Sequence, residues 1–299
     1  MIRKNPLKIY IYNYCLPLIL SLFLSACTGV GVKETQPDWH VSTQSGLAQG
    51  ISIRKGVVSW IDIPYAMPPV NELRWRAPRE YLDRNGVLIS VTESKKICPQ
   101  KADLTANLEG DSVVGDEDCL YLDIRAPETF LEDRKIPVMV WIHGGGNTTG
   151  HKGAYNFSKF VANQGVIVVT INYRLGPLGW FTHPSLQKGQ PGLDATSNFG
   201  TLDIIEALKW INNNIDQFGG DAENITVFGE SAGGHNVYTL LASPLAEGLF
   251  QKAISQSGYV ELASLNEAFN EDTRFEYVTR SSNELVKSLG VKLEANGLR

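Results

Sequence analysis

The first apolar stretch of the chain lies at its beginning and carries its own charge pattern. Residues 1–27 contain no acidic residue, have three basic residues before Ile9, and are then mostly apolar up to position 26. A positive segment followed by an apolar one is typical of a secretory signal peptide. We therefore predict that residues 1–27 direct export and are not part of the folded domain.

The signal segment ends in Leu24-Ser25-Ala26-Cys27, which resembles the lipobox of bacterial lipoproteins. In that class a peptidase cuts before the cysteine and the thiol carries a diacylglycerol, so Cys27 is the expected lipidation site. The alternative is an uncleaved membrane anchor, because the apolar stretch is near the lower length limit for a membrane span. Thr28, in place of Asp, indicates the outer membrane by the sorting rule of the class. We expect an exported protein tethered to a membrane of the bacterial cell envelope.

The body of the chain begins with a polar segment without periodicity, residues 28–45, which predicts a tether. The folded domain is then expected to occupy residues 46–299. Alternating apolar residues after Gly46 predict early β-hairpins. Nearly continuous apolar runs at 136–142, 166–171 and 225–228 are typical of strands that are buried on both faces of a parallel sheet.

Helical spacing separates these apolar runs. Between positions 201 and 218, and again over 232–242, apolar residues recur every three or four positions, which predicts one buried helix face. A further strand is expected at 252–257, followed by a helical stretch. Alternation of strand, helix and strand predicts the α/β class, with a mainly parallel sheet covered by helices.

Composition and charge narrow the range of functions. The 299 residues are 43% hydrophobic and include 27 basic and 32 acidic side chains, for a net charge of −5. Loss of Arg3, Lys4 and Lys8 with the signal segment would make the chain more acidic. Such a chain lacks the positive field on which nucleic-acid binding depends, so we expect no nucleic-acid partner.

Export also decides how the four cysteines are interpreted. Cys15 would leave with the signal segment, and Cys27 would be acylated. Cys98 and Cys119 then remain as a pair in an oxidising compartment, which predicts a disulfide between them. Two buried free thiols are the alternative.

The sequence Gly229-Glu230-Ser231-Ala232-Gly233 lies between a predicted strand and a predicted helix. A serine nucleophile needs its hydroxyl raised above the sheet on a sharp turn, and glycines two positions to either side remove side chains that would collide there. The helix N-terminus also favours negative charge that develops on the bound substrate. We predict that Ser231 is a catalytic nucleophile.

The triglycine after His143 predicts a site for an oxyanion. Acyl transfer places negative charge on an oxygen of the tetrahedral intermediate, and preorganised backbone N–H groups stabilise that charge. Gly145 and Gly146, together with the amide of Ala232, can supply three such donors. The alternative is a glycine turn that only links a strand to a loop.

These motifs resemble those of the type-B carboxylesterases, the cholinesterase-like branch of the α/β hydrolases. Residues 218–233 resemble the active-serine signature of that family, and residues 117–123 resemble its second signature, which contains a disulfide cysteine. The resemblance covers most of 46–258. It implies the α/β-hydrolase fold, hydrolysis of a small carboxylic ester through an acyl-enzyme, a bridge between Cys98 and Cys119, and no cofactor or metal. It also implies that Glu230 lines the pocket floor, with pairing to a nearby arginine as the alternative.

Three positions depart from the family pattern. Asp62 and Asn71 stand where the family usually has glycine, and Asn147 follows the triglycine where an aromatic residue is common. These changes put the substrate preference in question more than the chemistry.

The catalytic histidine is the largest departure. In this fold the order along the chain is nucleophile, acid and histidine, and the sequence has one histidine after Ser231. That residue, His235, lies on the nucleophile's own helix, from which it cannot easily reach the side of attack. We therefore expect the acid and the histidine to lie beyond residue 299, so that the domain is incomplete, truncated before its last strands and little active alone.

Two other functions stay open. Hormone-sensitive-lipase-like esterases share the triglycine and the serine motif but lack the Glu-Asp-Cys-Leu segment. A non-catalytic, cholinesterase-like surface or adhesion protein would agree with the missing histidine, but such proteins usually lose the serine that Ser231 retains. The sequence gives no indication of the oligomeric state.

Overall fold

The computed structural model describes residues 39–83, 85–89, 92–94, 96–131, 135–260, 264, 268 and 281–290. The signal segment, the lipobox and most of the expected tether lie outside these residues. Residues 1–37 form a unit separate from the unit that begins at Asp38. No helix in the described residues is long and apolar enough to cross a membrane.

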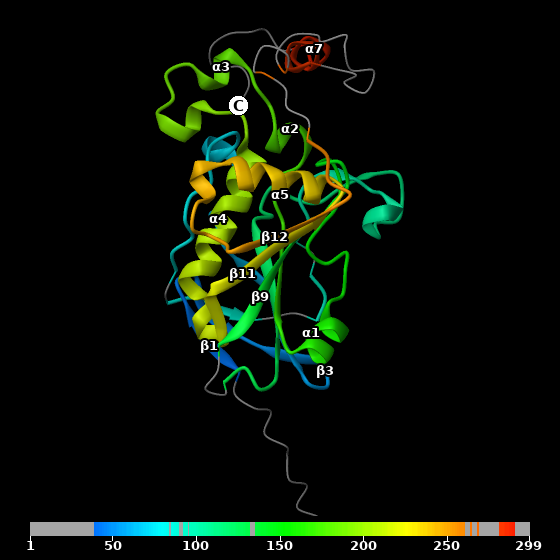
Figure 1. Ribbon diagram of the computed structural model, residues 1–299. Helices are drawn as coiled ribbons and strands as arrows, with labels where there is room; N and C mark the ends of the chain where they lie inside the picture. The colour runs from blue at the N-terminus through cyan, green and yellow to red at the C-terminus, as the bar shows by residue number, and fades with distance from the viewer. Residues whose placement is uncertain are drawn as a thin grey trace, which may run out of the picture. The chain divides into compact units, whose positions relative to one another are not determined.

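A seven-stranded sheet forms the centre of the folded unit, in the order β12-β11-β9-β10-β8-β4-β3 (Figure 1). Its strands, in chain order, are β3 Ile51–Arg54, β4 Val57–Pro64, β8 Tyr121–Pro127, β9 Ile136–Ile142, β10 Ile167–Ile171, β11 Gly220–Glu230 and β12 Lys252–Gln256. The ladders that join β12, β11, β9 and β10 are parallel, and those that join β10, β8, β4 and β3 are antiparallel. The α/β class is confirmed, and the sheet is mixed rather than mainly parallel.

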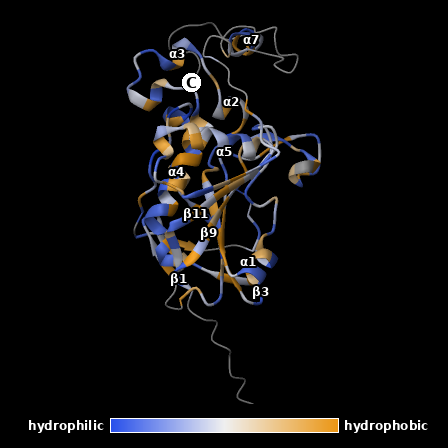
Figure 2. Ribbon diagram, in the orientation of Figure 1, coloured by the Kyte–Doolittle hydropathy of each residue, from blue (hydrophilic) through white to orange (hydrophobic). Residues whose placement is uncertain are grey.

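Helices cover both faces of this sheet. Val168 of β10 packs with Val161 of α1 (Ser158–Gln164). The next residue, Val169, belongs to the large core that includes α4 (Phe199–Asn214). Because successive residues of a strand face opposite sides, α1 and α4 lie on opposite faces (Figure 1). Figure 2 shows apolar residues concentrated on the strands between these helices.

The two long helices form where the apolar spacing predicts them. α4 continues into a 3₁₀ turn at Ile215–Phe218 and ends at Gly219, whose φ of 76° suits glycine. α5 spans Ala232–Ala242. The remaining helices are short: α2 Gly176–Gly179, α3 Pro184–Gln187 and α7 Ser282–Ser288, with 3₁₀ turns at Asn71–Leu73, Leu104–Ala106, Gly192–Ala195 and Pro244–Ala246.

Part of the expected tether belongs to the folded domain. β1 (His40–Thr43) pairs with β2 (Gly46–Gln49), which also pairs with β5 (Val87–Ile89). Trp39 is buried, and its carbonyl oxygen accepts a hydrogen bond from Nε1 of Trp60 at 3.1 Å. The domain therefore begins before Gly46, because a large aromatic side chain in the polar segment is anchored in the core.

The predicted disulfide is present. Cys98 and Cys119 are bonded, with their Cα atoms 5.0 Å apart. The segment between them contains a two-stranded ribbon, β6 (Gln100–Lys101) with β7 (Val113–Val114). The bridge therefore anchors a loop of irregular structure to the core, where both cysteines are buried.

The last described elements agree with the predicted strand and helical stretch. β12 forms the end of the sheet that follows α5, and α7 buries Val286 against Phe181 and Leu186. Residues 291–299, the end of the expected helical stretch, lie outside the described residues. The expected position of the triad acid and histidine beyond residue 299 stays a prediction.

Candidate active site

Ser231 occupies the sharp turn between β11 and α5. Its φ of 55° and ψ of −120° lie outside the regions that residues other than glycine favour. Its amide donates to the carbonyl oxygen of Gln256 at 2.9 Å, and its carbonyl oxygen accepts from the amide of His235 at 2.9 Å. These bonds hold the turn, and the partly exposed hydroxyl makes no hydrogen bond to another described residue.

Gly229 and Gly233, on either side of the serine, are required because other backbone groups lie too close to leave room for a side chain. A Cβ atom at Gly229 would lie 2.5 Å from the carbonyl group of Gly233. A Cβ atom at Gly233 would lie 2.0 Å from the carbonyl oxygen of Ile142. The start of α5 can therefore pack against the end of β9 only without side chains at these two positions, which agrees with the steric reason for the motif.

The loop after β9 brings its glycines beside the serine. A Cβ atom at Gly144 would lie 3.3 Å from the Cβ of Ser231. None of the hydrogen bonds between described residues uses the backbone N–H of Gly145, Gly146 or Ala232 as its donor. These three amides, predicted as oxyanion donors, thus have no acceptor among the described residues and lie on the loop and the helix that meet at Ser231.

His143 begins this loop as a buried residue, with its ring stacked on that of Tyr173 at 4.3 Å between centroids. Nδ1 lies 2.9 Å from the carbonyl oxygen of Gly144, which can only accept, so in the neutral ring Nδ1 carries the proton. Burial lowers the pKa of His143 to about 4. The ring is therefore neutral at neutral pH and supports the loop without adding charge.

Glu230 lines a cavity of about 90 Å³ beside the loop, together with His143, Gly144 and Gly145. A Cβ atom at Gly144 would lie 2.9 Å from Oε2 of Glu230, so the carboxylate lies against the loop. Within the described residues Glu230 forms no ion pair with an arginine, which leaves the predicted lining role.

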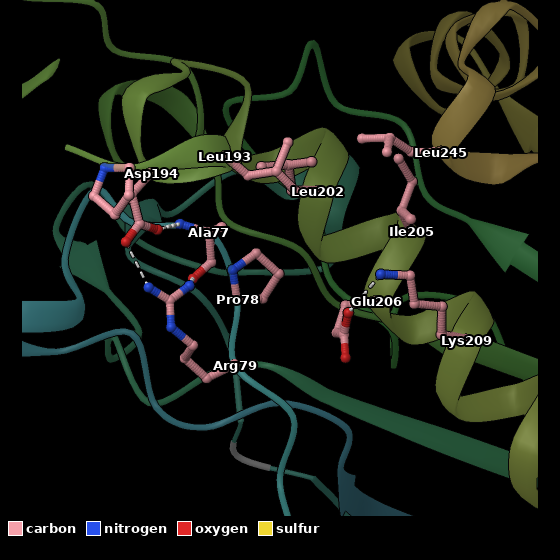
Figure 3. A pocket seen from close by; sticks show the side chains of 11 residues that line it. Ala77, Pro78, Arg79, Leu193, Asp194, Leu202, Ile205, Glu206, Lys209 and Leu245 are labelled. Carbon is pink, nitrogen blue, oxygen red and sulfur yellow. Dashed lines mark hydrogen bonds and ion pairs between the residues drawn. The ribbon is translucent and has the colours of Figure 1, made fainter.

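A larger cavity of about 350 Å³ (Figure 3) shares no described lining residue with the cavity beside the loop. Apolar side chains and two ion pairs line it: Leu193, Leu202, Ile205 and Leu245, with Arg79–Asp194 at 2.6 Å and Lys209–Glu206 at 3.3 Å. Its lining contains no serine, cysteine or histidine. The candidate chemistry therefore lies at the smaller cavity, beside Ser231.

His235 contacts Tyr259 and does not contact the Ser231 hydroxyl through a hydrogen bond, so its position does not suit a general base. Its Nδ1 lies 2.8 Å from the carbonyl oxygen of Tyr259, and its ring stacks on that of Tyr259. No histidine or carboxylate among the described residues is hydrogen-bonded to the Ser231 hydroxyl. The described site thus has a serine and three amide donors but lacks the base that a serine hydrolase requires.

Two residues that the sequence did not single out lie under the loop. Nδ2 of Asn236 donates to Oδ1 of Asn147 at 2.9 Å. The hydroxyl of Tyr173 donates to the carbonyl oxygen of His143 at 2.6 Å. One feature of the sequence could have indicated Asn236: it is a polar residue on the predicted buried face of α5.

Comparison with known proteins gives close relatives. The pattern that defines the carboxylesterase family matches residues 37–292. Para-nitrobenzyl esterase of Bacillus subtilis (strain 168) is 43% identical over 237 residues, which are 79% of this chain and 47% of that protein. Fumonisin B1 esterase of Sphingopyxis macrogoltabida is 41% identical over 244 residues, which are 80% of this chain and 44% of that protein. The chain thus spans about half the length of these relatives.

Solved structures give the same result. A PNB esterase matches with a TM-score of 0.70 at 38% identity, over 85% of this chain and 49% of that one. A carboxylesterase of Geobacillus stearothermophilus matches with a TM-score of 0.62 at 35% identity, over 72% of this chain and 42% of that one. The chain belongs to the carboxylesterase family and has the α/β-hydrolase fold of these structures.

Proposed function

We propose that this chain carries the nucleophile and the oxyanion site of a carboxylic ester hydrolase. The observation that carries this proposal is the strained turn at Ser231, which begins the helix next to the glycine loop. The amides of Gly145, Gly146 and Ala232, which donate to no other described residue, support it. The names of the relatives, para-nitrobenzyl esterase and fumonisin B1 esterase, support the same reaction type. The substrate class is a small carboxylic ester.

The proposed reaction has two steps. Oγ of Ser231 attacks the ester carbonyl carbon, the alcohol leaves with a proton, and water then releases the acid from the acyl-enzyme. In both steps the carbonyl oxygen becomes negative and accepts hydrogen bonds from Gly145, Gly146 and Ala232. In this proposal the base that takes the proton from Ser231 comes from outside the described residues, because none of them is hydrogen-bonded to the hydroxyl.

Reaction with a fluorophosphonate probe tests the proposal, because the probe phosphorus is attacked by the same oxygen. Because the described residues supply no base to activate the serine, we expect slow labelling. After long incubation with excess probe, mass spectrometry should locate the probe on Ser231 of the purified chain and find none on a Ser231→Ala variant. Ser52→Ala, a matched change at an exposed serine, should label like the wild type. A label at another serine, or no label under excess probe, would contradict the proposal.

Hydrolysis of a nitrophenyl ester by the same preparation tests the missing base. Without a base, donors and binding alone leave an acceleration of roughly 10³ to 10⁴ over water, so we expect slow turnover. Rapid turnover by the 299-residue chain would show that a group in this chain serves as the base.

We also propose that the protein is exported and attached to the cell envelope through a lipid on Cys27. The charge pattern of residues 1–27 and the Leu-Ser-Ala-Cys sequence support this proposal. Incorporation of labelled fatty acid into the wild type, but not into a Cys27→Ser variant, is the expected result.

A further inference from the structure

We infer that Asn236 is a positioning residue that holds the oxyanion loop, residues 143–150, against the helix of the nucleophile. It acts through Asn147, whose side chain it binds. This inference rests on the function proposed above, because it concerns where the loop amides lie relative to Ser231.

The loop needs such a contact because its backbone has little preference of its own. Gly145, Gly146 and Asn147 follow one another with φ values of 95°, 61° and 55°. Glycine adopts many conformations, and the left-handed region is costly for most other residues, although asparagine enters it more readily. Two consecutive glycines therefore keep one shape only if the residues beside them are held in place.

Asn147 is held through both its main chain and its side chain. Its carbonyl oxygen accepts from the amide of Gly176 at 2.7 Å. Its Oδ1 accepts from Nδ2 of Asn236 at 2.9 Å, and Asn236 is 2% exposed. Asn236 lies on α5, the helix that begins directly after Ser231, so this bond fixes the end of the glycine run relative to the nucleophile.

The start of the loop is held by a separate contact. Tyr173 donates to the carbonyl oxygen of His143, directly before the triglycine, at 2.6 Å. The ring of Tyr173 also stacks on that of His143. The loop is therefore anchored at its first residue by Tyr173, and after the two glycines by the bond between Asn236 and Asn147.

The rate at which a fluorophosphonate labels Ser231 measures this positioning, because the phosphonyl oxygen uses the same donors. We compare the full chain with Asn236→Ala, Asn147→Gly and the double variant. Glycine at 147 accepts the left-handed backbone and removes the amide side chain, but it also adds backbone freedom to the loop. The decisive variant is therefore Asn236→Ala, which leaves the loop sequence unchanged. Each single change should slow labelling by about 10- to 100-fold, the range expected when reacting groups are displaced by up to about 1 Å.

The double variant and a conservative variant separate positioning from general loss of structure. Since both single changes remove the same bond, the double variant should be no slower than the slower single variant. Asn147→Asp keeps an oxygen acceptor at a residue that tolerates the left-handed region, so it should label within about threefold of the wild type. Asn212→Ala removes a matched amide that binds Leu249, far from the loop contacts, and should leave the rate unchanged.

Hydrogen exchange at residues 144–150 provides a readout that does not depend on reaction. Exchange there should accelerate in Asn236→Ala and Asn147→Gly but not in Asn212→Ala. Unchanged labelling and exchange in Asn236→Ala would overturn the inference, and so would independent, multiplying effects in the double variant. If Asn236→Ala fails to fold, Asn236→Leu removes the same donor while filling the buried space, and it takes the place of the alanine variant. If the wild type does not label at Ser231, the proposed function fails while exchange still tests the contact.

Discussion

Asp62, Asn71 and Asn147, the three departures from the family pattern, all have left-handed backbone, with φ values of 64°, 51° and 55°. Asparagine and aspartate enter this region more readily than other residues with a Cβ atom. At positions 62 and 71, where glycine is usual, the chain therefore keeps a backbone that suits glycine and adds a polar side chain. Their expected effect on substrate preference stays a prediction.

At Asp62 the added side chain has a partner. Its Oδ1 lies 2.6 Å from Nζ of Lys152, a fully buried ammonium that Asp123 also binds at 2.5 Å. Both Asp62→Ala and Asp62→Gly remove this contact, but alanine also carries the cost of the left-handed backbone. We expect both variants to unfold at a lower urea concentration than the wild type. The free energy of unfolding of Asp62→Ala should be about 1 kcal/mol below that of Asp62→Gly. Equal stability of the two variants would contradict this explanation.

Single residues were predictable where the chemistry requires neighbours in sequence. Ser231 and the glycines around it are recognisable because a sharp turn needs them within five positions. Asn236 and Asn147 are far apart in the chain, and their hydrogen bond exists only because α5 packs against the loop. No local sequence pattern predicts that two such distant residues form a hydrogen bond.

Strands and helices were predictable in the half of the sheet that carries the site. The runs at β9, β10 and β11 and the spacing in α4 and α5 gave elements of the right type. The direction of a strand was not predictable, because β8 is as thoroughly buried as the parallel strands β9 and β10 but runs antiparallel to β10. Hydrophobic pattern reports burial, whereas direction depends on how the connections cross the sheet.

A buried ion pair joins the segment after β10 to α4. Arg174 binds Asp203 through two hydrogen bonds of 2.8 and 2.7 Å, and their side chains are 3% and 0% exposed. Removing one partner leaves a buried charge uncompensated, so Arg174→Met should lower the free energy of unfolding by about 3 to 5 kcal/mol. The double variant Arg174→Met/Asp203→Leu should regain part of that loss in denaturation experiments. A double variant less stable than the single one would contradict this account.

At the scale of the whole molecule, one edge of the sheet carries exposed apolar side chains. Among the described strands β12 pairs on one side only, with β11, and Ile254 in it is 45% exposed. Tyr259 and Val260, directly after the strand, are 46% and 72% exposed. Unpaired backbone groups beside apolar side chains form a template for association with other chains.

We therefore expect Ile254→Lys to reduce aggregation of the purified chain, since a charge on an edge strand opposes pairing. Light scattering during storage at fixed concentration measures the effect. Leu104→Lys, a matched change at a residue that is 77% exposed in a 3₁₀ turn, should have little influence. A wild-type chain that stays monodisperse, or an equal benefit from both variants, would show that the edge is not the cause.

The left-handed run at Gly145, Gly146 and Asn147 limits how this protein can be engineered. Few residues accept this backbone geometry, so most variants in a library randomised at these positions would have a distorted loop, whatever substrate is tested. Directed evolution of selectivity has more freedom at Thr148, which is exposed and follows the run.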